Sequence, residues 1–365
     1  MRVLYDHQAF SLQDYGGISR IFTELILGLK SQGIDVNLPL LYSNNVHLKE
    51  AGMKPDVLLQ NINVKKRGLI YAANDLYNTY EIGKGNFDIY HPTYYNPDLI
   101  KYAKNKPLVA TYHDMINEKF SGVYKELQSD KSIISQKKRL IEKANGIIAV
   151  SENTKKDLIE IYGISPSKIK VIYLGNSFSA NTDSSLPLVK NPYLLFVGNR
   201  GLYKNFIPLL TAIAPLLISN DISLVCAGGK IFDSTEQDHM ESLSLTNKVQ
   251  QVAINDVSLA NLYSNAISFI FPSLYEGFGI PILEAFSCNC PCVLSNRGSL
   301  PEVAGDAAIF FEPDDLHSMF EAVKKVIEDQ SLRNKMVQRG KERLKRYSWS
   351  KHVQDTIQLY NEIIA

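Results

Sequence analysis

The chain is poor in the residues that mark metal-binding and disulfide-rich domains. Its 365 residues include four cysteines, Cys226, Cys288, Cys290 and Cys292. The last three alternate in a Cys-x-Cys-x-Cys run, which is not the spacing of zinc ligands. We interpret all four as small buried residues in a reducing compartment rather than as metal ligands or a redox site. An Asp-x-Asp pair that could hold a divalent cation is also missing, so we expect no metal and no other cofactor.

Long hydrophobic runs are missing as well. The first apolar run, residues 3–5, ends at Asp6, which is too early for the core of a signal peptide. No apolar stretch reaches the roughly 18 residues that a bilayer-spanning helix needs. We therefore expect neither a signal peptide nor a transmembrane helix, and we predict a cytoplasmic location.

Charge of one sign is not in excess. The formal net charge of +1 gives no indication of a nucleic-acid-binding surface. The halves differ, however, because residues 1–175 carry 23 Lys and Arg against 18 Asp and Glu, a net of +5, whereas residues 176–365 carry 16 against 20, a net of −4. This asymmetry suggests that the first half meets something anionic, and uneven surface charge explains it equally well.

Short β-branched runs and amphipathic stretches alternate along the chain, which is typical of parallel sheets with crossover helices. We therefore predict an α/β fold. The expected strands are 1–5, 87–91, 108–112, 146–151, 170–173, 193–197, 223–227, 266–271 and 292–295. The expected helices are 18–32, 130–144, 153–162, 205–217, 257–264, 280–287, 316–328 and 331–346.

A break in this pattern divides the chain into domains. Residues 175–192 are rich in Asn, Ser and Asp, carry two prolines and lack apolar periodicity, as a linker does. We predict an N-terminal domain over 1–175, a C-terminal domain over 190–345 and a helical tail within 346–365. The tail has one apolar face, which must dock on another part of the chain. That face consists of Val353, Ile357, Tyr360 and Ile364.

The most informative motif is residues 271–285, Phe-Pro-Ser-Leu-Tyr-Glu-Gly-Phe-Gly-Ile-Pro-Ile-Leu-Glu-Ala. A strand should end at Pro272 and a helix should begin near Ile280. Gly277 and Gly279 let the backbone approach a ligand closely, and the N–H groups at a helix start favour an anion such as phosphate.

Two carboxylates belong to this motif. Glu276 lies in the expected turn, and Glu284 follows eight positions later in the helix. Carboxylates accept hydrogen bonds from sugar and ribose hydroxyls, so one ligand could contact both. The alternative is that Glu276 caps the helix and Glu284 is solvated.

The Glu-x7-Glu spacing, with Glu-Gly-Phe-Gly at 276–279, resembles the donor-site motif of glycosyltransferase family 4. The resemblance covers nearly the whole chain. It includes Tyr-Gly-Gly-Ile-Ser-Arg at 15–20, His-Asp at 113–114, Ala-Val-Ser-Glu at 149–152, Val-Gly-Asn-Arg at 197–200, Lys-Asn at 204–205 and Leu-Pro-Glu-Val-Ala-Gly at 300–305.

The resemblance implies the GT-B fold of two facing Rossmann-like domains. The N-terminal domain is then expected to bind the acceptor and the C-terminal domain the nucleotide sugar, with the C-terminal helix crossing back to the N-terminal domain. It also implies which residues of the motif contact the donor: Gly277, Phe278, Gly279, Ile280, Glu284 and, as a catalytic residue, Glu276.

Arg200 and Lys204 lie four positions apart, between an expected strand and the helix 205–217. Arginine offers a bidentate fork and lysine a point charge. Stabilising the charge that develops on a leaving group usually makes the largest single contribution to the rate enhancement of an enzyme. The resemblance implies that these two residues clamp the donor diphosphate in place of a metal ion. Two surface cations are the alternative.

In the first half, the resemblance points to two loops that follow strands, where open α/β sheets bind ligands. Gly16 and Gly17 are expected to face the donor phosphate and the reacting sugar. His113 is expected to be catalytic, through a hydrogen bond to the donor sugar or contact with the acceptor. Asp114 is expected to hold the loop and contribute to binding. A lone Gly-Gly turn or a structural histidine is the alternative.

Two further expectations concern the site that binds the nucleobase and a contact with the membrane. The family binds the base through backbone groups near a turn that corresponds to Ile254 and its neighbours, where Asp256 is expected to cap the next helix. The basic stretches 65–67 and 137–139 lie in the first half, and a basic amphipathic helix can contact an anionic membrane. A solvated helix face is the alternative.

Together these features predict a retaining, metal-independent hexosyltransferase. Similarity of residues 16–22 to bacterial O-antigen and capsule mannosyltransferases makes GDP-mannose the first expected donor and a glycan or lipid-linked glycan the expected acceptor. A UDP-sugar-dependent transferase or an epimerase of the same fold is the alternative enzyme, and a sugar-binding protein is the non-enzymatic alternative. A dehydrogenase is disfavoured because no Gly-x-Gly-x-x-Gly follows the first strand.

Overall fold

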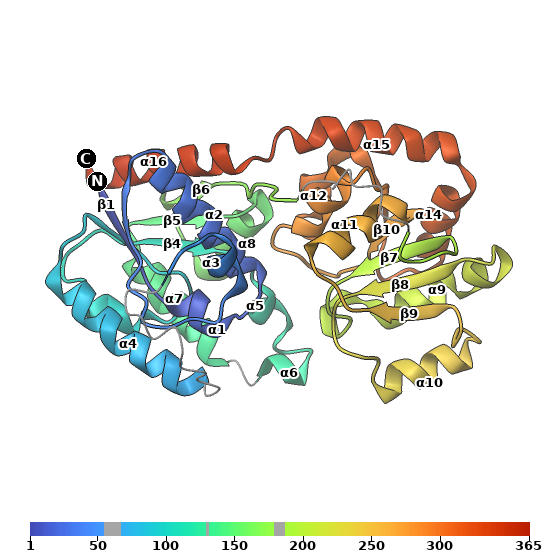
Figure 1. Ribbon diagram of the computed structural model, residues 1–365, viewed down its shortest axis with the longest axis horizontal. Helices are drawn as coiled ribbons and strands as arrows, with labels where there is room; N and C mark the ends of the chain where they lie inside the picture. Colours follow the sequence, from blue (N-terminus) through green and yellow to red (C-terminus); the bar gives the residue numbers. More distant parts are fainter. Residues whose placement is uncertain (55–66, 129–130, 179–186) are drawn as a thin grey trace. The chain divides into compact units, whose positions relative to one another are not determined.

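The computed structural model describes residues 1–54, 67–128, 131–178 and 187–365. The chain forms two compact units (Figure 1). Unit 1 consists of residues 1–175 together with 349–365, and unit 2 consists of residues 176–348. The final segment of the chain therefore belongs to the unit formed by the first residues.

Unit 1 contains parallel strands in two hydrogen-bonded groups. The first group has the order β2-β1-β3 and the second the order β4-β5-β6. An isolated parallel bridge between Tyr90 and Leu108 joins the two groups. The strands are β1 (Arg2–Tyr5), β2 (Asp35–Asn37), β3 (Ile89–His91), β4 (Val109–Tyr112), β5 (Gly146–Ala149) and β6 (Ile169–Val171).

Helices and short 3-10 turns connect these strands, as parallel pairing requires. They are α1 (Gln8–Leu12), α2 (Gly17–Ser31), α3 (Val46–Glu50), α4 (Arg67–Lys84), η1 (Pro97–Tyr102), α5 (Ile116–Phe120), α6 (Lys125–Gln128), α7 (Lys131–Lys143), α8 (Glu152–Tyr162) and η2 (Pro166–Lys168). The last helix of the chain, α16 (Trp349–Ile364), completes the unit.

Unit 2 is built on a six-stranded parallel sheet with the order β12-β11-β10-β7-β8-β9. The chain winds outward from β7 to β9, then returns to the other side of β7 through β10. This reversal is the topological switch point where open α/β sheets bind ligands. The strands are β7 (Tyr193–Val197), β8 (Ser223–Ala227), β9 (Val249–Val252), β10 (Ser268–Phe271), β11 (Cys292–Ser295) and β12 (Ala308–Phe311).

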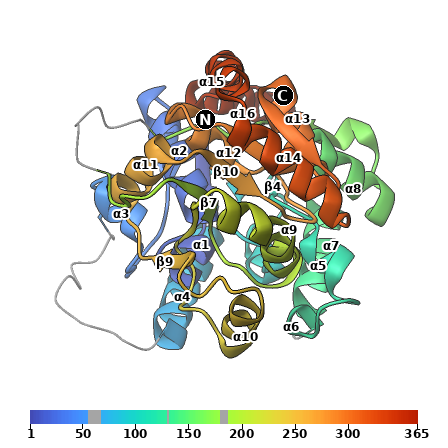
Figure 2. The same cartoon turned by 90° about the vertical axis from the view of Figure 1, so that its right-hand side faces the viewer.

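Helices α9 and α14 of unit 2 pack side by side (Figure 2), and α14 also contacts β11 and β12. The helical elements of unit 2 are η3 (Leu202–Lys204), α9 (Phe206–Ser219), α10 (Ser234–Ser242), α11 (Asp256–Asn265), α12 (Ile280–Ser287), α13 (Leu300–Ala304), η4 (Gly305–Ala307), α14 (Leu316–Glu328) and α15 (Gln330–Leu344).

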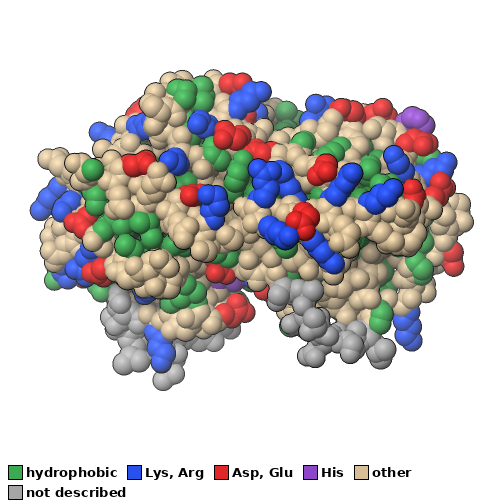
Figure 3. All heavy atoms as spheres, turned by 90° about the horizontal axis from the view of Figure 1, so that it is seen from above, with side chains coloured by type: hydrophobic (Ala, Val, Ile, Leu, Met, Phe, Trp, Pro, Cys, Tyr) green, Lys and Arg blue, Asp and Glu red, His purple; other side chains and the backbone are tan. Residues whose placement is uncertain are grey.

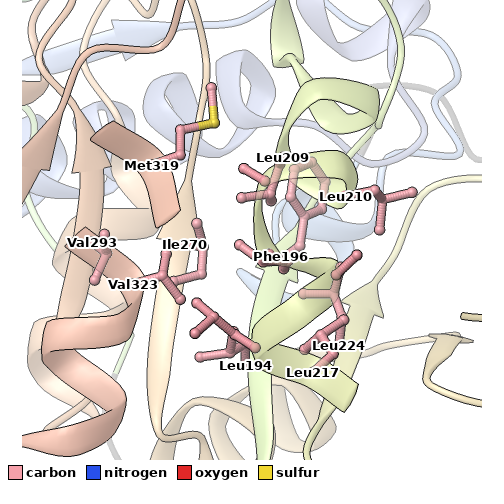
Figure 4. Packing of buried hydrophobic residues seen from close by; sticks show 14 of the residues in the cluster. Leu194, Phe196, Leu209, Leu210, Leu217, Leu224, Ile270, Val293, Met319 and Val323 are labelled. Atoms are coloured by element: carbon pink, nitrogen blue, oxygen red, sulfur yellow. The ribbon is translucent and has the colours of Figure 1, made fainter. Parts of the chain in front are cut away.

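The core of unit 2 corrects one expectation. Residues 202–219 are long and apolar enough to cross a membrane by length and composition, contrary to the sequence prediction. In the fold, α9 packs this apolar surface against β7 and α14, where Leu209, Leu210, Phe196 and Met319 form part of one buried cluster (Figure 4). Burial in a core is the ordinary use of so apolar a helix.

All four cysteines are buried and unpaired.

Surface charge in unit 2 is uneven. Residues 176–365 are acidic on average, yet α15 exposes Lys335, Arg339 and Lys341. Figure 3 shows Lys and Arg side chains gathered on the face that carries this helix. The average charge of the second half therefore does not describe this surface.

The C-terminal helix packs on unit 1, as expected. Val353 of α16 fills the space beside Gly28 of α2, and a Cβ at Gly28 would collide with it. The hydroxyl of Tyr360 lies 2.7 Å from that of Tyr5 in β1 and 2.6 Å from Nδ1 of His91 in β3. The helix is thus held on unit 1 by apolar packing and by buried hydrogen bonds.

Candidate functional site

In unit 2, the segment after β7 forms a tight turn at the switch point. Gly198 has φ of +108° and Asn205 has φ of +58°, and Asn205 precedes the first residue of α9. Between them lie Arg200 and Lys204. The carboxyl end of β7 therefore carries both of the predicted diphosphate-binding cations.

The guanidinium of Arg200 is engaged within the protein. Its Nε and Nη2 donate to the two carboxylate oxygens of Glu236 at 2.8 and 3.2 Å, and Nη2 also donates to the carbonyl of Lys230 at 2.6 Å. The guanidinium carbon lies 4.4 Å from the ring centroid of Phe232. Its Nη1 is buried and, among the described residues, has no hydrogen-bond partner. The fork expected to face a diphosphate instead faces Glu236, which leaves Nη1 as the available donor.

Lys204 is paired with a second predicted site residue. Its Nζ lies 2.6 Å from Oε1 of Glu276, and the two side chains are 18% and 12% exposed. The ammonium also lies over the rings of Phe271 and Tyr203. The fold therefore joins the turn after β7 to the turn after β10 through one short ion pair.

The turn after β10 is held firmly around Glu276. Its carbonyl accepts hydrogen bonds from the backbone N–H and the hydroxyl of Ser299, at 3.3 and 3.0 Å. Gly298 lies so close to this backbone that a Cβ there would stand 2.9 Å from the Glu276 carbonyl oxygen. The segment containing Gly277 and Phe278 is buried. The main chain of the turn that carries the Glu276 side chain is thus held in place.

Helix α12 begins directly after this turn. Gly279 has φ of +96° and precedes Ile280, with a proline in the first turn. Glu284 lies one turn along and is buried, and its Oε2 accepts a hydrogen bond from the Tyr263 hydroxyl at 3.1 Å. Glu276 and Glu284 are therefore held differently, the first by a cation and the second by a buried tyrosine of α11. Burial and Glu284 raise the pKa of Tyr263 well above its ordinary value, so the phenol stays protonated and donates.

The turn after β9 contains Ile254, which is half-buried and packs near Gly228. Here one expectation is wrong, because Asn255 rather than Asp256 caps α11. The Asn255 side chain accepts from the Ser258 N–H at 2.8 Å, and the Ser258 hydroxyl accepts from the Asn255 N–H. Asn255 is extended, as a capping residue must be, whereas Asp256 is already helical.

In unit 1, Gly16 and Gly17 form the start of α2. The Gln13 side chain accepts the backbone N–H of Ser19 at 3.0 Å, and the Ser19 hydroxyl donates to the Gly16 carbonyl at 3.0 Å. A Cβ at Gly16 would collide with Gln13, while a Cβ at Gly17 would meet nothing within 4 Å. A side chain at position 16 would thus displace the Gln13 amide from its hydrogen bond to Ser19, and Gly17 has open space beside it.

His113 follows β4 and is buried. Its backbone N–H donates to the Tyr95 hydroxyl at 3.1 Å, and its Nδ1 has no hydrogen-bond partner among the described residues. Burial, opposed by Asp114 and assisted by Lys137, lowers the pKa of His113 to about 4. The imidazole is therefore neutral at physiological pH. Asp114 accepts the Ile116 N–H at 3.1 Å and so holds the loop.

The predicted basic stretches are placed differently. Lys65 and Lys66 lie outside the described residues. Lys137 is buried, with a side chain 1% exposed, so it does not belong to a solvated or membrane-facing surface with its exposed neighbours Lys138 and Arg139. The expectation of one basic face on this helix is wrong because α7 turns Lys137 inward, toward Asp114 and Glu118.

Sequence reasoning missed three residues that hold predicted site residues: Glu236, Tyr263 and Lys137. The pattern Asp-x-x-Glu at 233–236 does signal a capping box, which the structure contains. Nothing in it signals the pairing with Arg200. Among the described residues, no group of three or more His, Cys, Asp or Glu side chains is arranged to hold a metal ion.

Comparison with known proteins relates both units to one class of enzyme. Residues 15–176 match the family model described as Glycosyltransferase Family 4, and residues 179–343 match the model described as Glycosyl transferases group 1. The O-antigen chain mannosyltransferase B of Escherichia coli is 28% identical over 286 residues, 74% of each chain. The MMP alpha-(1->4)-mannosyltransferase of Mycolicibacterium hassiacum is 25% identical over 300 residues, 77% of this chain and 72% of that protein.

Solved structures confirm the fold. Sucrose-phosphate synthase from Thermosynechococcus elongatus superposes with a TM-score of 0.76 at 20% identity, covering 99% of this chain and 98% of that one. Anabaena HepE, solved in complex with UDP and glucose, gives a TM-score of 0.72 at 17% identity over 99% of each chain. The predicted α/β architecture of the GT-B type is therefore correct.

Proposed function

The chain belongs to glycosyltransferase family 4 and is a glycosyltransferase, and from this premise we propose that it transfers mannose from GDP-mannose to a glycan or lipid-linked glycan. The proposed setting is the synthesis of a bacterial surface polysaccharide in the cytoplasm. The mannosyltransferases among its relatives support the sugar. We propose that unit 2 binds the nucleotide sugar and that unit 1 supplies the acceptor site.

The observation that carries the donor site is the Lys204–Glu276 ion pair at the switch point of unit 2. It places a cation for the diphosphate beside a carboxylate for sugar hydroxyls, with the start of α12 adjacent. Arg200 adds one buried donor, Nη1. We propose that Glu284 binds the ribose and that backbone groups near Ile254 contact the base.

The proposed chemistry retains the configuration at the anomeric carbon. The acceptor oxygen bonds to that carbon as the bond to the diphosphate oxygen breaks, and the acceptor proton passes to the departing phosphate. Lys204 and Arg200 stabilise the charge that develops on the diphosphate, so no metal ion is needed. His113, with a neutral imidazole and an unpartnered Nδ1, is proposed to hydrogen-bond the donor sugar or the acceptor.

A screen of nucleotide sugars by thermal shift tests the donor. GDP-mannose should raise the melting temperature more than GDP alone, and more than UDP-glucose, UDP-N-acetylglucosamine or dTDP-rhamnose. The selected donor should then be consumed only with an acceptor, and EDTA should leave the rate unchanged. Turnover without an acceptor would indicate an epimerase, unchanged donor on long incubation a binding protein, and strict Mn²⁺ dependence would contradict the metal-free mechanism.

We also propose that unit 1 contacts an anionic membrane through α4. This helix buries Asn74 and Asn78, which hydrogen-bond to the Tyr42 and Pro39 carbonyls, and exposes Leu69, Leu76 and Tyr80 at 62%, 73% and 63%. Its buried side is thus half polar, with Asn74 and Asn78 between Ile70 and Ile82, and apolar side chains remain exposed, as the membrane contact that we propose requires. Arg67 and Lys84 stand at its two ends.

Vesicle sedimentation tests this contact. Vesicles of phosphatidylethanolamine and phosphatidylglycerol should retain the protein, and Leu76→Ser with Tyr80→Ser should release it without changing its melting temperature. The matched control is Val257→Ser, at an exposed apolar residue of unit 2. Equal retention of the α4 variant and the wild type would remove α4 from the proposal.

A further inference from the structure

A fully buried lysine lies beneath the loop that carries His113. The Nζ of Lys137 donates to the main-chain carbonyl of Asp114 and to Oε2 of Glu118, each at 3.0 Å. Glu118 is 4% exposed and also accepts a hydrogen bond from the Tyr162 hydroxyl at 2.7 Å. A buried ammonium is costly unless it is paired and hydrogen-bonded. Both of its polar partners belong to the loop after β4 and the helix that follows.

Lys137 contacts both neighbours of His113 in the sequence. On one side, the Tyr112 hydroxyl donates to the Lys137 carbonyl at 2.7 Å. On the other side, the Asp114 carbonyl accepts from the Lys137 ammonium. The ammonium also lies 5.0 Å from the ring centroid of Tyr95, whose hydroxyl accepts the His113 N–H. The turn around His113 is thus tied to α7 at both neighbours, to the Lys137 ammonium at Asp114 and to the Lys137 main chain at Tyr112, while the Tyr95 hydroxyl holds the His113 N–H.

We propose that Lys137 is a positioning residue for the transfer reaction, whose buried ammonium fixes the Tyr112–Asp114 turn so that the His113 imidazole is presented to the sugar. This inference rests on the proposed function through the role of His113. The proposed residue touches neither the donor nor the acceptor. It acts through the main chain of the loop and through its charge.

The charge also bears on the protonation of His113. The charged and titratable groups that interact with this imidazole are Asp114 from its own loop, Lys137 from α7, His352 from α16 and His91 from β3. Asp114 favours the protonated form, whereas burial, Lys137 and His352 favour the neutral form. Removing the lysine charge should therefore raise the pKa of His113. A neutral imidazole keeps one ring nitrogen as an acceptor and the other as a donor.

The competing reading is that Lys137 only compensates the buried charge of Glu118. A double variant distinguishes these two explanations of Lys137. Lys137→Met leaves a buried carboxylate unpaired, which is destabilising in either reading, whereas Lys137→Met with Glu118→Leu removes both charges and should restore stability. A structural role predicts that activity returns together with stability. A positioning role predicts that stability returns alone, because the Asp114 carbonyl still lacks its donor.

The first measurement needs no substrate. The His113 ring resonances of the full-length protein are followed by NMR from pH 3.5 to 8, and they are identified by their loss in His113→Gln. In the double variant His113 should titrate at a higher pH than in the wild type. In the matched control Lys138→Met, where the adjacent exposed lysine loses its charge, it should titrate as in the wild type. Unchanged titration in the double variant would overturn the proposal.

The second measurement uses GDP-mannose, or the donor that the thermal-shift screen selects in its place. The double variant should regain most of the melting temperature that Lys137→Met loses, and it should keep the wild-type Kd for the nucleoside diphosphate, because unit 2 is untouched. Its kcat should fall about 10–100-fold, the scale for a misplaced reacting group. Wild-type kcat in the double variant would show that Lys137 is structural. Failure of the wild type to transfer any sugar would refute the proposed function, and the NMR result would still decide whether Lys137 controls His113.

Discussion

Removing the Arg200 side chain should destabilise unit 2 as well as slow the reaction. From the sequence alone, both Arg200 and Lys204 are predicted to clamp the donor diphosphate, and the loss of either should change the melting temperature little without ligand. In the structure, the Arg200 and Glu236 side chains are only 4% and 10% exposed. Arg200→Ala therefore leaves a buried carboxylate without its partner. Breaking a buried ion pair in this way costs about 3–5 kcal/mol.

That cost translates into a large thermal shift. Unit 2 spans residues 176–348, a size at which 1 kcal/mol lowers the melting temperature by about 2–4 °C. We therefore expect a decrease of about 6–20 °C for Arg200→Ala. Lys204→Ala should cost less, because the Lys204 side chain is 18% exposed against 4% for Arg200, so its removal opens the remaining carboxylate to water.

Scanning calorimetry measures this shift, and the chain provides an internal reference. The single tryptophan, Trp349, lies in α16 of unit 1, so its fluorescence follows the unit that the change does not touch. The calorimetric transition of unit 2 should move to lower temperature, while the fluorescence transition should move less. The double variant Arg200→Ala with Glu236→Ala should be more stable than Arg200→Ala alone, because no buried charge remains unpaired. A decrease below about 2 °C, or purely additive single effects, would refute the reasoning.

Three further predictions concern the candidate site and the C-terminal helix. Glu276→Ala should abolish transfer in a folded protein and Lys204→Ala should lower kcat/KM about 10²–10³-fold; near-normal turnover of either variant would remove that residue from the site. The free energy of unfolding should fall as the pH drops from about 6.5 toward 4, because burial lowers the pKa of His91, His113 and His352 to about 3, 4 and 4, and the unfolded chain therefore binds protons that the folded chain does not. The expected loss is about 1.4 kcal/mol per histidine per pH unit, measured by urea denaturation, and a flat profile would contradict it. Tyr360→Phe should cost about 1–3 kcal/mol, since Tyr5 and His91 both lose a buried hydrogen-bond partner, whereas Leu359→Ile should cost less than about 1.5 kcal/mol in the same denaturation assay.

Two helices show what the helical repeat of the sequence can predict about which side chains are buried. In α7, Lys137 falls three or four positions from Ile133, Ile134, Leu140 and Ile141, so the helical repeat already places it on the apolar face. Reading it together with Lys138 and Arg139 as a basic run concealed this. In α4 the buried positions 70, 74, 78 and 82 follow the helical repeat, but two of them are asparagines, and Leu76 lies exposed. Which face of a helix is buried depends on what packs against it.

The sequence by itself determined the features that are encoded within a few residues. β-branched runs set the strands, the glycine turn at 277–279 set the start of α12, and the apolar spacing in 349–364 required a docked helix. Local sterics and periodicity are sufficient for these. The tertiary structure alone decided the partners of the site residues. Arg200 meets Glu236 from 36 positions away, Glu284 meets Tyr263 across 21, and Asp114 meets Lys137 across 23. Such pairs form only when the fold brings helices and turns that are distant in the sequence against one another, and no local spacing records which segments will meet.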